Sequence, residues 1–366
     1  MEEISALIAL LEMEGVGSAH CRSLRQKWGS LAQLWHLPKD APLFLQPHLP
    51  KLSTLRAKAL SIIESCEKIG VQIVPFWHKD FPIILQHSPQ PPALLYVKGT
   101  LPQSHRIYAA VIGTRRPSPY GMQAVVHFTE TFVQAGLGII SGLAYGIDGQ
   151  AHRTCLAAGG HTVAVLAHGL DQIYPPAHRQ LAEDILAKGG GWVSEYPPGT
   201  PVHPLRFPPR NWLMVRLSQF TVVIESREKG GAMFTARAAL EAGRSVYAVP
   251  GSIFSPTSQG THELIAKHIA QIASSPQMVL REIEHVASHL PLIPASPSPL
   301  PEGPVEAQIY QFLEEGQRHI DEILAHTGLP IGQLLSVLVR MEVAGWIQQK
   351  PGGFVLRLIP PSAISE

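Results

Sequence analysis

The chain has 366 residues, of which 45% are hydrophobic and 16% charged, and its formal net charge is only +1. This length allows two or three domains, and the composition is typical of a globular protein with a buried core. A chain this close to neutral has no general attraction for polyanions, so any nucleic acid would have to be held by local arginines.

Three features of the sequence indicate the cellular compartment: the cysteines, the N-terminal residues and the hydropathy. Cys21, Cys66 and Cys155 lie far apart, so we predict neither a disulfide framework nor a metal-binding CxxC pair, and a reducing compartment fits. The first residues, MEEISALIALLEMEG, are acidic where a signal peptide is basic. No apolar run is long enough to span a membrane. We expect a cytoplasmic protein with no membrane partner, metal or cofactor.

The first 70 residues or so are predicted to be helical. Apolar residues from Ile4 to Leu11 recur at helical spacing, and a Gly-Val-Gly turn at 15–17 precedes a second helix that runs toward Trp28. This is the pattern of a helix-hairpin-helix, whose loop amides can hold a phosphate. A small helical bundle with a tight turn explains the same pattern and is the interpretation we favour, with the helix-hairpin-helix as the alternative.

From about residue 105 to 250 the sequence alternates strands and helices. Several strands are short, continuous apolar runs, which is typical of strands covered on both faces. The alternation predicts right-handed βαβ units, an α/β fold and an open parallel sheet, whose ligands bind beyond the carboxyl ends of the strands. The predicted strands are 107–112, 137–140, 162–166, 192–195, 220–225 and 245–249, and the predicted helices are 120–135, 147–158, 177–188 and 232–242.

The C-terminal part is predicted to form a winged-helix module. Residues 288–304 are a Pro/Ser-rich linker, after which helices are predicted near 306–315, 319–327 and 331–344, followed by two short strands around Pro-Gly-Gly. Residues 302–366 contain four Lys or Arg against eight Asp or Glu, and the last helix offers one arginine. We favour a protein-binding or packing domain, with a DNA reader as the alternative.

The loop after the first core strand is a candidate anion site. Gly113 permits close approach of the backbone to a ligand, and the helix that follows supplies amides and the positive end of its dipole. Arg115 and Arg116 add full charges. Neither GxGxxG nor GxxxxGK[ST] is present, so the dinucleotide and P-loop fingerprints are absent. An arginine pair on an ordinary surface turn is the alternative.

Two later loops have related features. Ser141 and Gly142 form a small turn with free amides, and Asp148 beyond them is expected to cap or to start a helix and not to be catalytic. Gly230 and Gly231 make a glycine turn into another helix, which suits an anion.

The stretch 203–219, HPLRFPPRNWLMVRLSQ, interleaves arginines with aromatic residues. In single-strand binding proteins, cations track the phosphates while rings stack on the bases, and Arg210 and Phe207 fit those two roles. Trp212 fits the second role, or else the core of the helix it lies in.

Six stretches of the chain occur in this order: FPIILQHSPQPPALLYVKGT, VIGTRRPSPYG, SGLAYGIDGQAH, FPPRN, KGGAMFTARAALEAGR and VYAVPG. Together they resemble the DprA/Smf family of DNA-processing proteins, over roughly residues 75–270. The resemblance implies a single-stranded DNA-binding homodimer that protects incoming DNA and helps to load the RecA recombinase during natural transformation. It implies a helical domain of SAM or helix-hairpin-helix type at 1–70, an extended Rossmann-like core at 71–287, the linker at 288–304 and a winged-helix-like domain at 305–366.

The family motifs also imply which residues contact single-stranded DNA. They are Gly113, Thr114, Arg115, Arg116, Ser141, Gly142, Phe207, Arg210, Asn211, Gly230 and Gly231. At Tyr145 and Trp212 this chain has aromatic residues where the family usually has arginine, so we consider both as base-stacking candidates.

The segment THELIAKHIAQI has apolar residues near helical spacing, at Leu264, Ile265 and Ile269. The resemblance makes part of this surface a candidate twofold interface, whereas an edge helix packed on its own sheet is the simpler interpretation.

A nucleoside-monophosphate phosphoribohydrolase of the cytokinin-activating type is the main alternative function. Such Rossmann-like enzymes also use a Gly-Gly loop that opens a helix, but they need a glutamate in that turn, in the form PGGxGTxxE. Here Glu241 falls ten residues past Gly231. We also reject an HExxH metalloprotease, because His262 and His268 are six residues apart and point to different sides of a helix. We therefore expect a protein that holds its anion and does not transform it.

Overall fold

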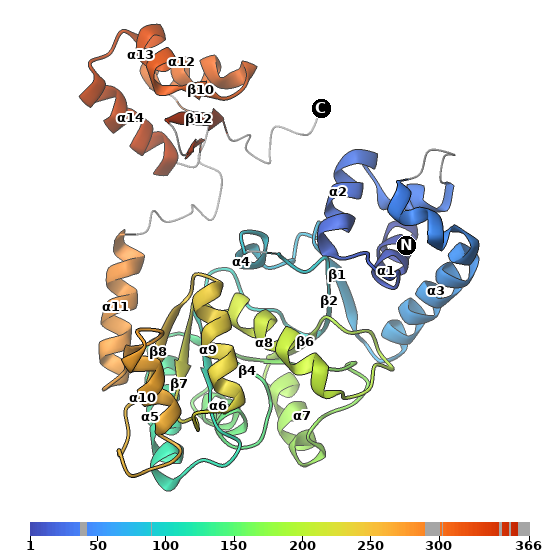
Figure 1. Ribbon diagram of the computed structural model, residues 1–366, viewed down its shortest axis with the longest axis vertical. Helices are drawn as coiled ribbons and strands as arrows, with labels where there is room; N and C mark the ends of the chain where they lie inside the picture. Colours follow the sequence, from blue (N-terminus) through green and yellow to red (C-terminus); the bar gives the residue numbers. More distant parts are fainter. Residues whose placement is uncertain are drawn as a thin grey trace. The chain divides into compact units, whose positions relative to one another are not determined.

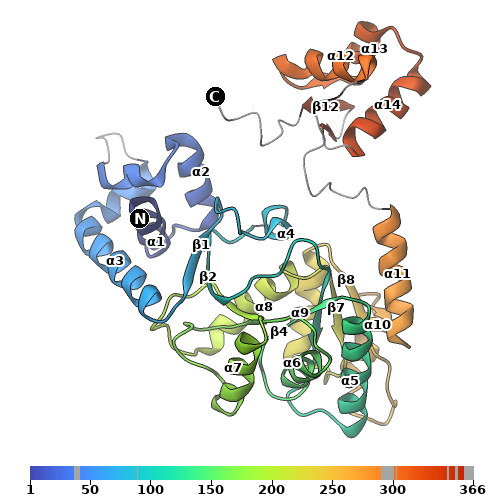
Figure 2. The same ribbon diagram turned by 180° about the vertical axis from the view of Figure 1, so that it is seen from behind.

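A computed structural model describes residues 1–36, 42–88, 90–289, 301, 303–343, 346–350 and 353–357. The chain divides into two compact units, Met1–Leu280 and Arg281–Glu366, which we describe separately (Figures 1 and 2). Most of the expected linker lies outside the described residues. The expected domain boundaries near residues 70, 287 and 304 stay predictions.

One mixed sheet organises the first unit. Among its described residues, nine strands follow the order β1-β2-β6-β5-β4-β3-β7-β8-β9. The strands from β6 to β9 are parallel, whereas β1 and β2 form an antiparallel extension at one edge. The strands are β1 (Gln72–Pro75), β2 (Leu94–Gly99), β3 (Tyr108–Ile112), β4 (Gly138–Ser141), β5 (Thr162–Val165), β6 (Gly191–Ser194), β7 (Phe220–Val223), β8 (Ser245–Ala248) and β9 (Gln271–Ile272). All six predicted strands are therefore confirmed, and β1, β2 and β9 were missed.

Helices cover both faces of this sheet (Figure 1). Val163 and Val165 of β5 belong to the hydrophobic cluster under α8 and α9, while Ala164 between them belongs to the cluster that includes α7. This alternation is what a strand buried on both faces requires. The helices of the core are α4 (Ile83–Gln86), α5 (Pro119–Gln134), α6 (Ile147–Ala157), α7 (Arg179–Ala187), α8 (Phe207–Arg216), α9 (Gly231–Glu241), α10 (Gln259–Ala266) and α11 (Pro276–His289). The four core helices predicted from the sequence are confirmed.

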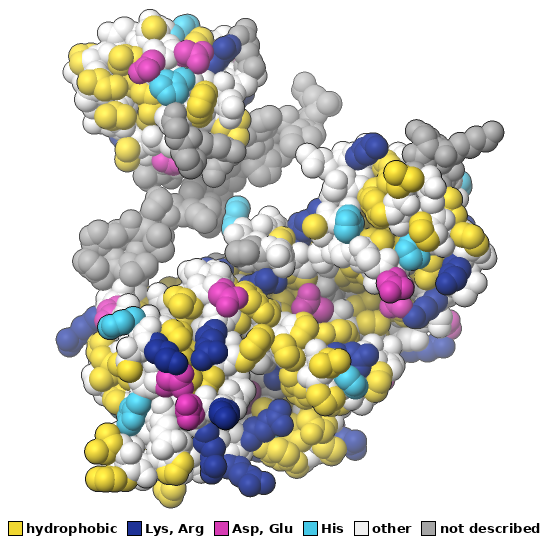
Figure 3. Space-filling model, viewed as in Figure 1, with side chains coloured by type: hydrophobic (Ala, Val, Ile, Leu, Met, Phe, Trp, Pro, Cys, Tyr) yellow, Lys and Arg dark blue, Asp and Glu magenta, His cyan; other side chains and the backbone are white. Residues whose placement is uncertain are grey.

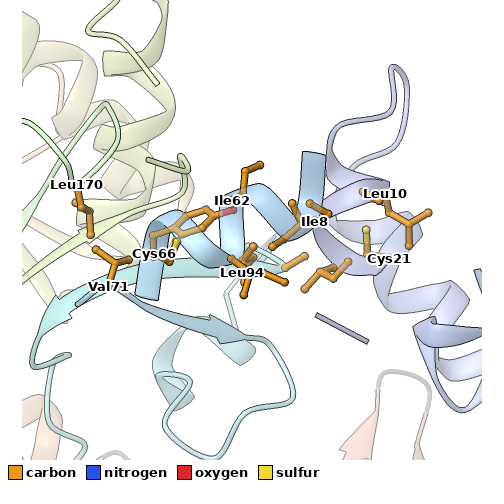
Figure 4. Close-up of a cluster of buried hydrophobic side chains, with 14 of the residues drawn as sticks. Ile8, Leu10, Cys21, Ile62, Cys66, Val71, Leu94 and Leu170 are labelled. Atoms are coloured by element: carbon orange, nitrogen blue, oxygen red, sulfur yellow. The ribbon is translucent and has the colours of Figure 1, made fainter. Parts of the chain in front are cut away.

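The N-terminal helices share a hydrophobic cluster with β2 and with the loop that follows β5. Figure 4 shows side chains such as Ile8, Ile62, Leu94 and Leu170 in this continuous cluster. The amide of Gly17, in the Gly-Val-Gly turn, donates to Nδ1 of the chain's own His20 at 3.2 Å, which favours a helical bundle over a phosphate-binding hairpin. The elements are α1 (Glu2–Leu11), α2 (Ser18–Trp28), α3 (Leu52–Lys68) and two 3-10 helices (Leu31–His36 and Leu43–Lys51).

The second unit has the predicted order of three helices and a hairpin. Its described residues also form a three-stranded antiparallel sheet in the order β10-β12-β11. Helix α14 buries Leu334 and Leu338, and exposes Ile331, Leu335 and Val339 at intervals of four residues. Its outward face is therefore apolar along this line. The elements are α12 (Pro304–Phe312), β10 (Arg318–His319), α13 (Ile320–Thr327), α14 (Ile331–Val343), β11 (Ile347–Lys350) and β12 (Phe354–Arg357).

The described residues contain neither a metal-binding cluster nor a single helix that could span a membrane. No group of three or more His, Cys, Asp or Glu side chains is placed there to hold a metal ion. No single helix in these segments is long and apolar enough to cross a membrane, and one bent pair, α13 with α14, reaches that length and composition only when the two are taken together. Cys21, Cys66 and Cys155 are buried and form no disulfide.

Burial of α3 against the N-terminal cluster generates a stability prediction. Ile63 is buried there, whereas Leu60 on the same helix is exposed. We expect Ile63→Ala to lower the free energy of unfolding by about 2–5 kcal/mol, because it removes buried methyl groups and leaves a cavity. Leu60→Ala is the matched control and should change it by about 0.5 kcal/mol or less. Urea unfolding measures both, and equal stabilities would contradict the packing described here.

Candidate nucleic-acid interface

A cleft opens where the direction of the sheet reverses. From β3 the chain proceeds outward through β4, β5 and β6, and then returns to β7 on the other side of β3. The loops after β3 and β7 therefore diverge, as at the ligand-binding switch points of open α/β sheets. The cleft holds about 470 Å³. Its lining comprises Ile112, Gly113, Thr114, Arg115, Ala144, Asp148, Phe207, Arg210, Asn211, Met214, Ser226, Arg227, Lys229, Gly230, Gly231, Ala232 and Thr235.

The loop after β3 is fixed at both sides. The amide of Thr114 donates to the carbonyl of Glu225 at 2.8 Å, and the carbonyl of Thr114 accepts from the amide of Ile147 at 3.2 Å. A Cβ on Gly113 would lie 2.5 Å from Cγ1 of Ile147, so only glycine fits this approach of β3 to α6. The exposed Arg115 projects from this fixed loop.

Glu225 is a buried carboxylate that joins three segments of the chain. Its Oε2 accepts from the amide of Ser118 at 2.9 Å, and its Oε1 accepts from the hydroxyls of Ser118 at 2.6 Å and Thr257 at 2.8 Å. Ser118 is the N-cap of α5, and a Cβ on Gly121 would lie only 2.1 Å from Oε2. The first turn of α5 therefore binds the chain's own carboxylate. We expected this helix start to hold the ligand anion, and the structure corrects that expectation.

The start of α9 is a helix N-terminus that faces the cleft. Gly230, Gly231 and Ala232 line it, and the first amides of a helix have no partner within that helix. A Cβ on Gly231 would meet nothing within 4 Å, so the backbone there is accessible. Arg227 and Lys229 lie in the loop just before and are exposed. The sequence prediction missed both cations, although a lysine next to the glycine pair was a visible signal.

Arg210 is buried at the wall of the cleft. Its Nη1 donates to the carbonyls of Gly142 at 2.6 Å and Val165 at 2.7 Å, and its Nε donates to Oδ1 of Asn211 at 2.9 Å. A Cβ on Gly142 would lie 2.4 Å from the guanidinium, so this glycine makes room for the arginine. Arg210 thus braces α8 against the ends of β4 and β5.

The charges around Arg210 respond to burial. Burial lowers the pKa of the Arg210 guanidinium to about 10, and the nearby Asp148 opposes that change. Burial also raises the pKa of the Asp148 carboxyl, against the influence of Arg210 and of the Gly142 amide, which donates to Asp148 Oδ2 at 3.2 Å. Of the two positions expected for Asp148, the N-cap or the start of α6, the structure shows the second, because the N-cap is Gly146 and Asp148 lies in the first turn.

Phe207 lies between two cations. The guanidinium carbons of Arg115 and Arg210 are each 5.5 Å from the centre of its ring. Tyr174, which is also exposed, approaches the same ring at 6.4 Å between centroids. Figure 3 shows more broadly that Lys and Arg side chains are interspersed with hydrophobic ones over the first unit. An arginine-flanked ring at the mouth of a cleft can stack on a planar base while the charges meet phosphates.

Other residues named from the family motifs lie outside the lining of the cleft. Ser141 is buried, and its hydroxyl donates a hydrogen bond to the carbonyl of Val111 at 2.7 Å. This hydroxyl hydrogen therefore stabilises the strand end and does not point to a ligand. Arg116 is exposed beside the cleft. Tyr145 is exposed and its ring lies 5.2 Å from that of His178. Trp212 packs partly against the core, with Arg216 4.8 Å from its ring centre. Base stacking by Tyr145 and Trp212 stays a prediction.

The candidate interface residues on and after α10 pack mainly inward. Leu264 has none of its side chain exposed, and Ile265 and Ile269 pack partly against the same core cluster. The side chain of Leu264 therefore fills the core of its own chain, and its part in an interface stays a prediction. Ile265 and Ile269 keep a partly accessible surface.

Comparison with known proteins identifies the family. A model described as "DNA recombination-mediator protein A" matches residues 72–284, and one described as "DprA winged helix domain" matches residues 293–353. The chain belongs to the DNA recombination-mediator protein A family. This confirms the resemblance to the DprA/Smf proteins, the α/β fold with a Rossmann-like core and the winged-helix module. Protein Smf of Escherichia coli is 35% identical over 293 residues, which are 79% of this chain and 78% of that protein.

Two solved DprA structures share the fold. DprA from Streptococcus pneumoniae is 33% identical with a TM-score of 0.55, over 63% of this chain and 81% of its own. DprA from Helicobacter pylori, which is described for its single-stranded DNA binding mode, is 27% identical with a TM-score of 0.52, over 59% of this chain and 96% of its own.

The hydrogen bonds of the buried Glu225 carboxylate generate a prediction about stability. Glu225→Gln places an NH2 group among donors, so one donor of Ser118 or Thr257 loses its acceptor. We expect the free energy of unfolding to fall by about 1–3 kcal/mol in urea titrations. Glu228→Gln, an exposed neighbour, should change it by about 0.5 kcal/mol or less. A Glu225→Gln protein as stable as the control would refute the anchoring role.

Proposed function

We propose that this chain binds single-stranded DNA across the cleft between the loops after β3 and β7. The observation that carries the proposal is the set of groups lining that cleft. Among the described residues that line the cleft, one side chain is acidic, Asp148, and four are cationic: Arg115, Arg210, Arg227 and Lys229. The amides of α9 and the ring of Phe207 complete a surface for phosphates and bases. The related H. pylori protein, described as binding single-stranded DNA, supports it.

A single strand fits these groups better than a duplex. Phosphate contacts alone would serve either form, but a ring such as Phe207 can stack only on bases that are unpaired and accessible. The other cleft residues named from the family motifs (Gly113, Thr114, Arg115, Phe207, Asn211, Gly230 and Gly231) are the proposed contacts. Arg210 would act mainly by positioning Phe207 and Asn211, since its donors already reach backbone carbonyls.

The wider role follows from the family. We propose that the bound strand is protected and passed to the RecA recombinase during natural transformation, in the cytoplasm. The family description as a recombination mediator supports this, because a mediator acts between bound DNA and a recombinase. The winged-helix module would bind protein, since the exposed stripe Ile331, Leu335 and Val339 on α14 is apolar where a groove-reading helix needs polar and cationic groups.

We propose that the DNA is held and not transformed. A phosphoribohydrolase needs a glutamate at the glycine turn, whereas Glu241 is the last residue of α9 and lies the whole length of that helix from Gly231. Asp148 in the cleft is committed to the Gly142 amide and to Arg210. Release of free base from a nucleoside monophosphate by the purified protein would favour the enzyme instead.

Arg115 provides the direct test of DNA binding. It is exposed on a fixed loop, so Arg115→Ala should remove a charge-assisted contact without unfolding the protein. We expect the affinity for a fluorescent oligo-dT to fall by about 1–3 kcal/mol in anisotropy titrations. Lys27→Ala, an exposed cation on α2, is the control and should bind as the wild type does. Unchanged affinity for Arg115→Ala, with an unchanged melting curve, would count against the proposed site.

We also propose a homodimer that uses the surface around Ile265 and Ile269. Beside it, β9 ends the sheet, and its residues Gln271 and Ile272 are exposed. We expect Ile269→Glu to halve the mass measured by light scattering at tens of micromolar, because a charge would be buried between copies. Leu60→Glu on the exposed face of α3 is the control. A wild-type monomer under these conditions would refute the dimer.

A further inference from the structure

A loop beside the cleft presents two unpartnered apolar side chains. Residues 250–258 follow β8, and at their tip Phe254 is 90% exposed and Ile253 is 76% exposed. Phe254 is the most exposed large hydrophobic side chain among the described residues. Water contact with a whole aromatic ring is unfavourable, so a feature of this kind usually has a binding partner.

The loop is anchored to the floor of the cleft. Thr257 donates its hydroxyl to Glu225 Oε1 at 2.8 Å, and its carbonyl accepts from the amide of Ser226, a cleft residue, at 2.8 Å. Within the tip, the amide of Phe254 donates to Ser252 Oγ at 3.2 Å. The two apolar side chains are thus presented by a turn that shares its anchor with the cleft.

Tyr120 lies between the β3 loop and the base of the 250–258 loop. Tyr120, in the first turn of α5, follows the arginines of the β3 loop and is exposed. Its hydroxyl donates to the carbonyl of Pro250, and a Cβ on Gly251 would lie 3.5 Å from its ring. Tyr120 therefore joins the segment that carries Arg115 to the base of the loop that carries Phe254, and both lie at the carboxyl ends of the parallel strands.

The chemistry of the loop identifies its occupant. Its sequence, PGSIFSPTS, contains no charged residue, so no side-chain charge on it attracts or repels a phosphate. Two apolar side chains surrounded by Ser, Thr, Gly and Pro are also a small area for a stable protein interface, which buries about 800 Å² per partner. A flat ring with no cation suits a nucleobase, whose stacking tolerates any sequence.

We propose that Phe254, supported by Ile253, is a second base-stacking position for a DNA strand that leaves the cleft over Tyr120. The inference rests on the proposed function and extends it, because it sets the path of the strand and lengthens the site beyond the cleft. Strands that fill only the cleft do not reach Phe254, whereas longer strands stack on it.

The test compares strands of increasing length. The reference ligand is the shortest oligo-dT that the wild type binds measurably. The variant Ile253→Ala/Phe254→Ala should bind this short strand with the same affinity as the wild type. It should bind a long oligo-dT about five- to hundredfold more weakly, the range for one lost base stack. The slope of log K against log[salt] should not change, because no phosphate contact is removed. Phe254→Trp should restore long-strand affinity.

Controls separate this inference from the function on which it rests. Leu43→Ala, an equally exposed apolar residue in the N-terminal region, should bind both lengths as the wild type does. Equal binding of long strands by the double variant and the wild type would overturn the second position and leave the cleft intact. A change of mass in light scattering would overturn it in favour of an interface between copies. A wild type that binds no single strand would overturn both proposals.

Discussion

The buried carboxylate of Glu225 is the interaction on which the cleft depends. It lies just past β7, at the point where the sheet reverses direction, and it accepts three hydrogen bonds from Ser118 and Thr257. A carboxylate in the interior is stable only when donors satisfy it, and the first turn of α5 adds the positive end of a helix dipole. One side chain thereby fixes the loops after β3 and β8 to the end of β7.

Two similar helix starts therefore have different roles, one in stabilising the fold and one in facing the proposed ligand. The start of α5 is closed by Glu225, whereas the start of α9 remains open, with Gly231 accessible and Lys229 beside it. An anion entering the cleft would therefore meet the amides of α9. The same reasoning applies to the arginines, because Arg210 is buried and donates to two backbone carbonyls and to Asn211, while Arg115 is exposed. Buried cations shape the site, and exposed ones remain for phosphates.

Rigid anchoring and exposed apolar groups occur together at this edge of the sheet. Phe207 is held between Arg115 and Arg210, and Phe254 is carried by a turn attached to Glu225 through Thr257. Preorganised rings lose little conformational entropy when a base stacks on them, so binding need not be offset by ordering of the site. The second unit presents its own apolar line on α14, which suits a different partner class from the charged cleft.

The sequence by itself determined the elements whose signals are local. Short apolar runs identified six of the seven parallel strands, and their order with the intervening helices identified the sheet. Glycine turns and arginines next to strand ends located Gly113, Arg115, Gly230 and Gly231, because the ends of parallel strands lie on one edge. The strands β1, β2 and β9 were not predicted. β9 has only two residues and β1 ends at a proline, whereas β2 was missed although its apolar run is six residues long.

Only the tertiary structure decided how each side chain is used. Ser118 and Glu225 are 107 residues apart in the chain, so no local pattern could show that a carboxylate would occupy the start of α5. Ser141, Arg210 and Leu264 match family motifs or helical spacing, yet all three are buried by elements that reach them through the fold. No sequence pattern distinguishes Phe254 from other loop residues, and only the tertiary structure shows that its side chain is exposed. Spacing along the chain encodes backbone conformation, whereas burial depends on which distant segments meet.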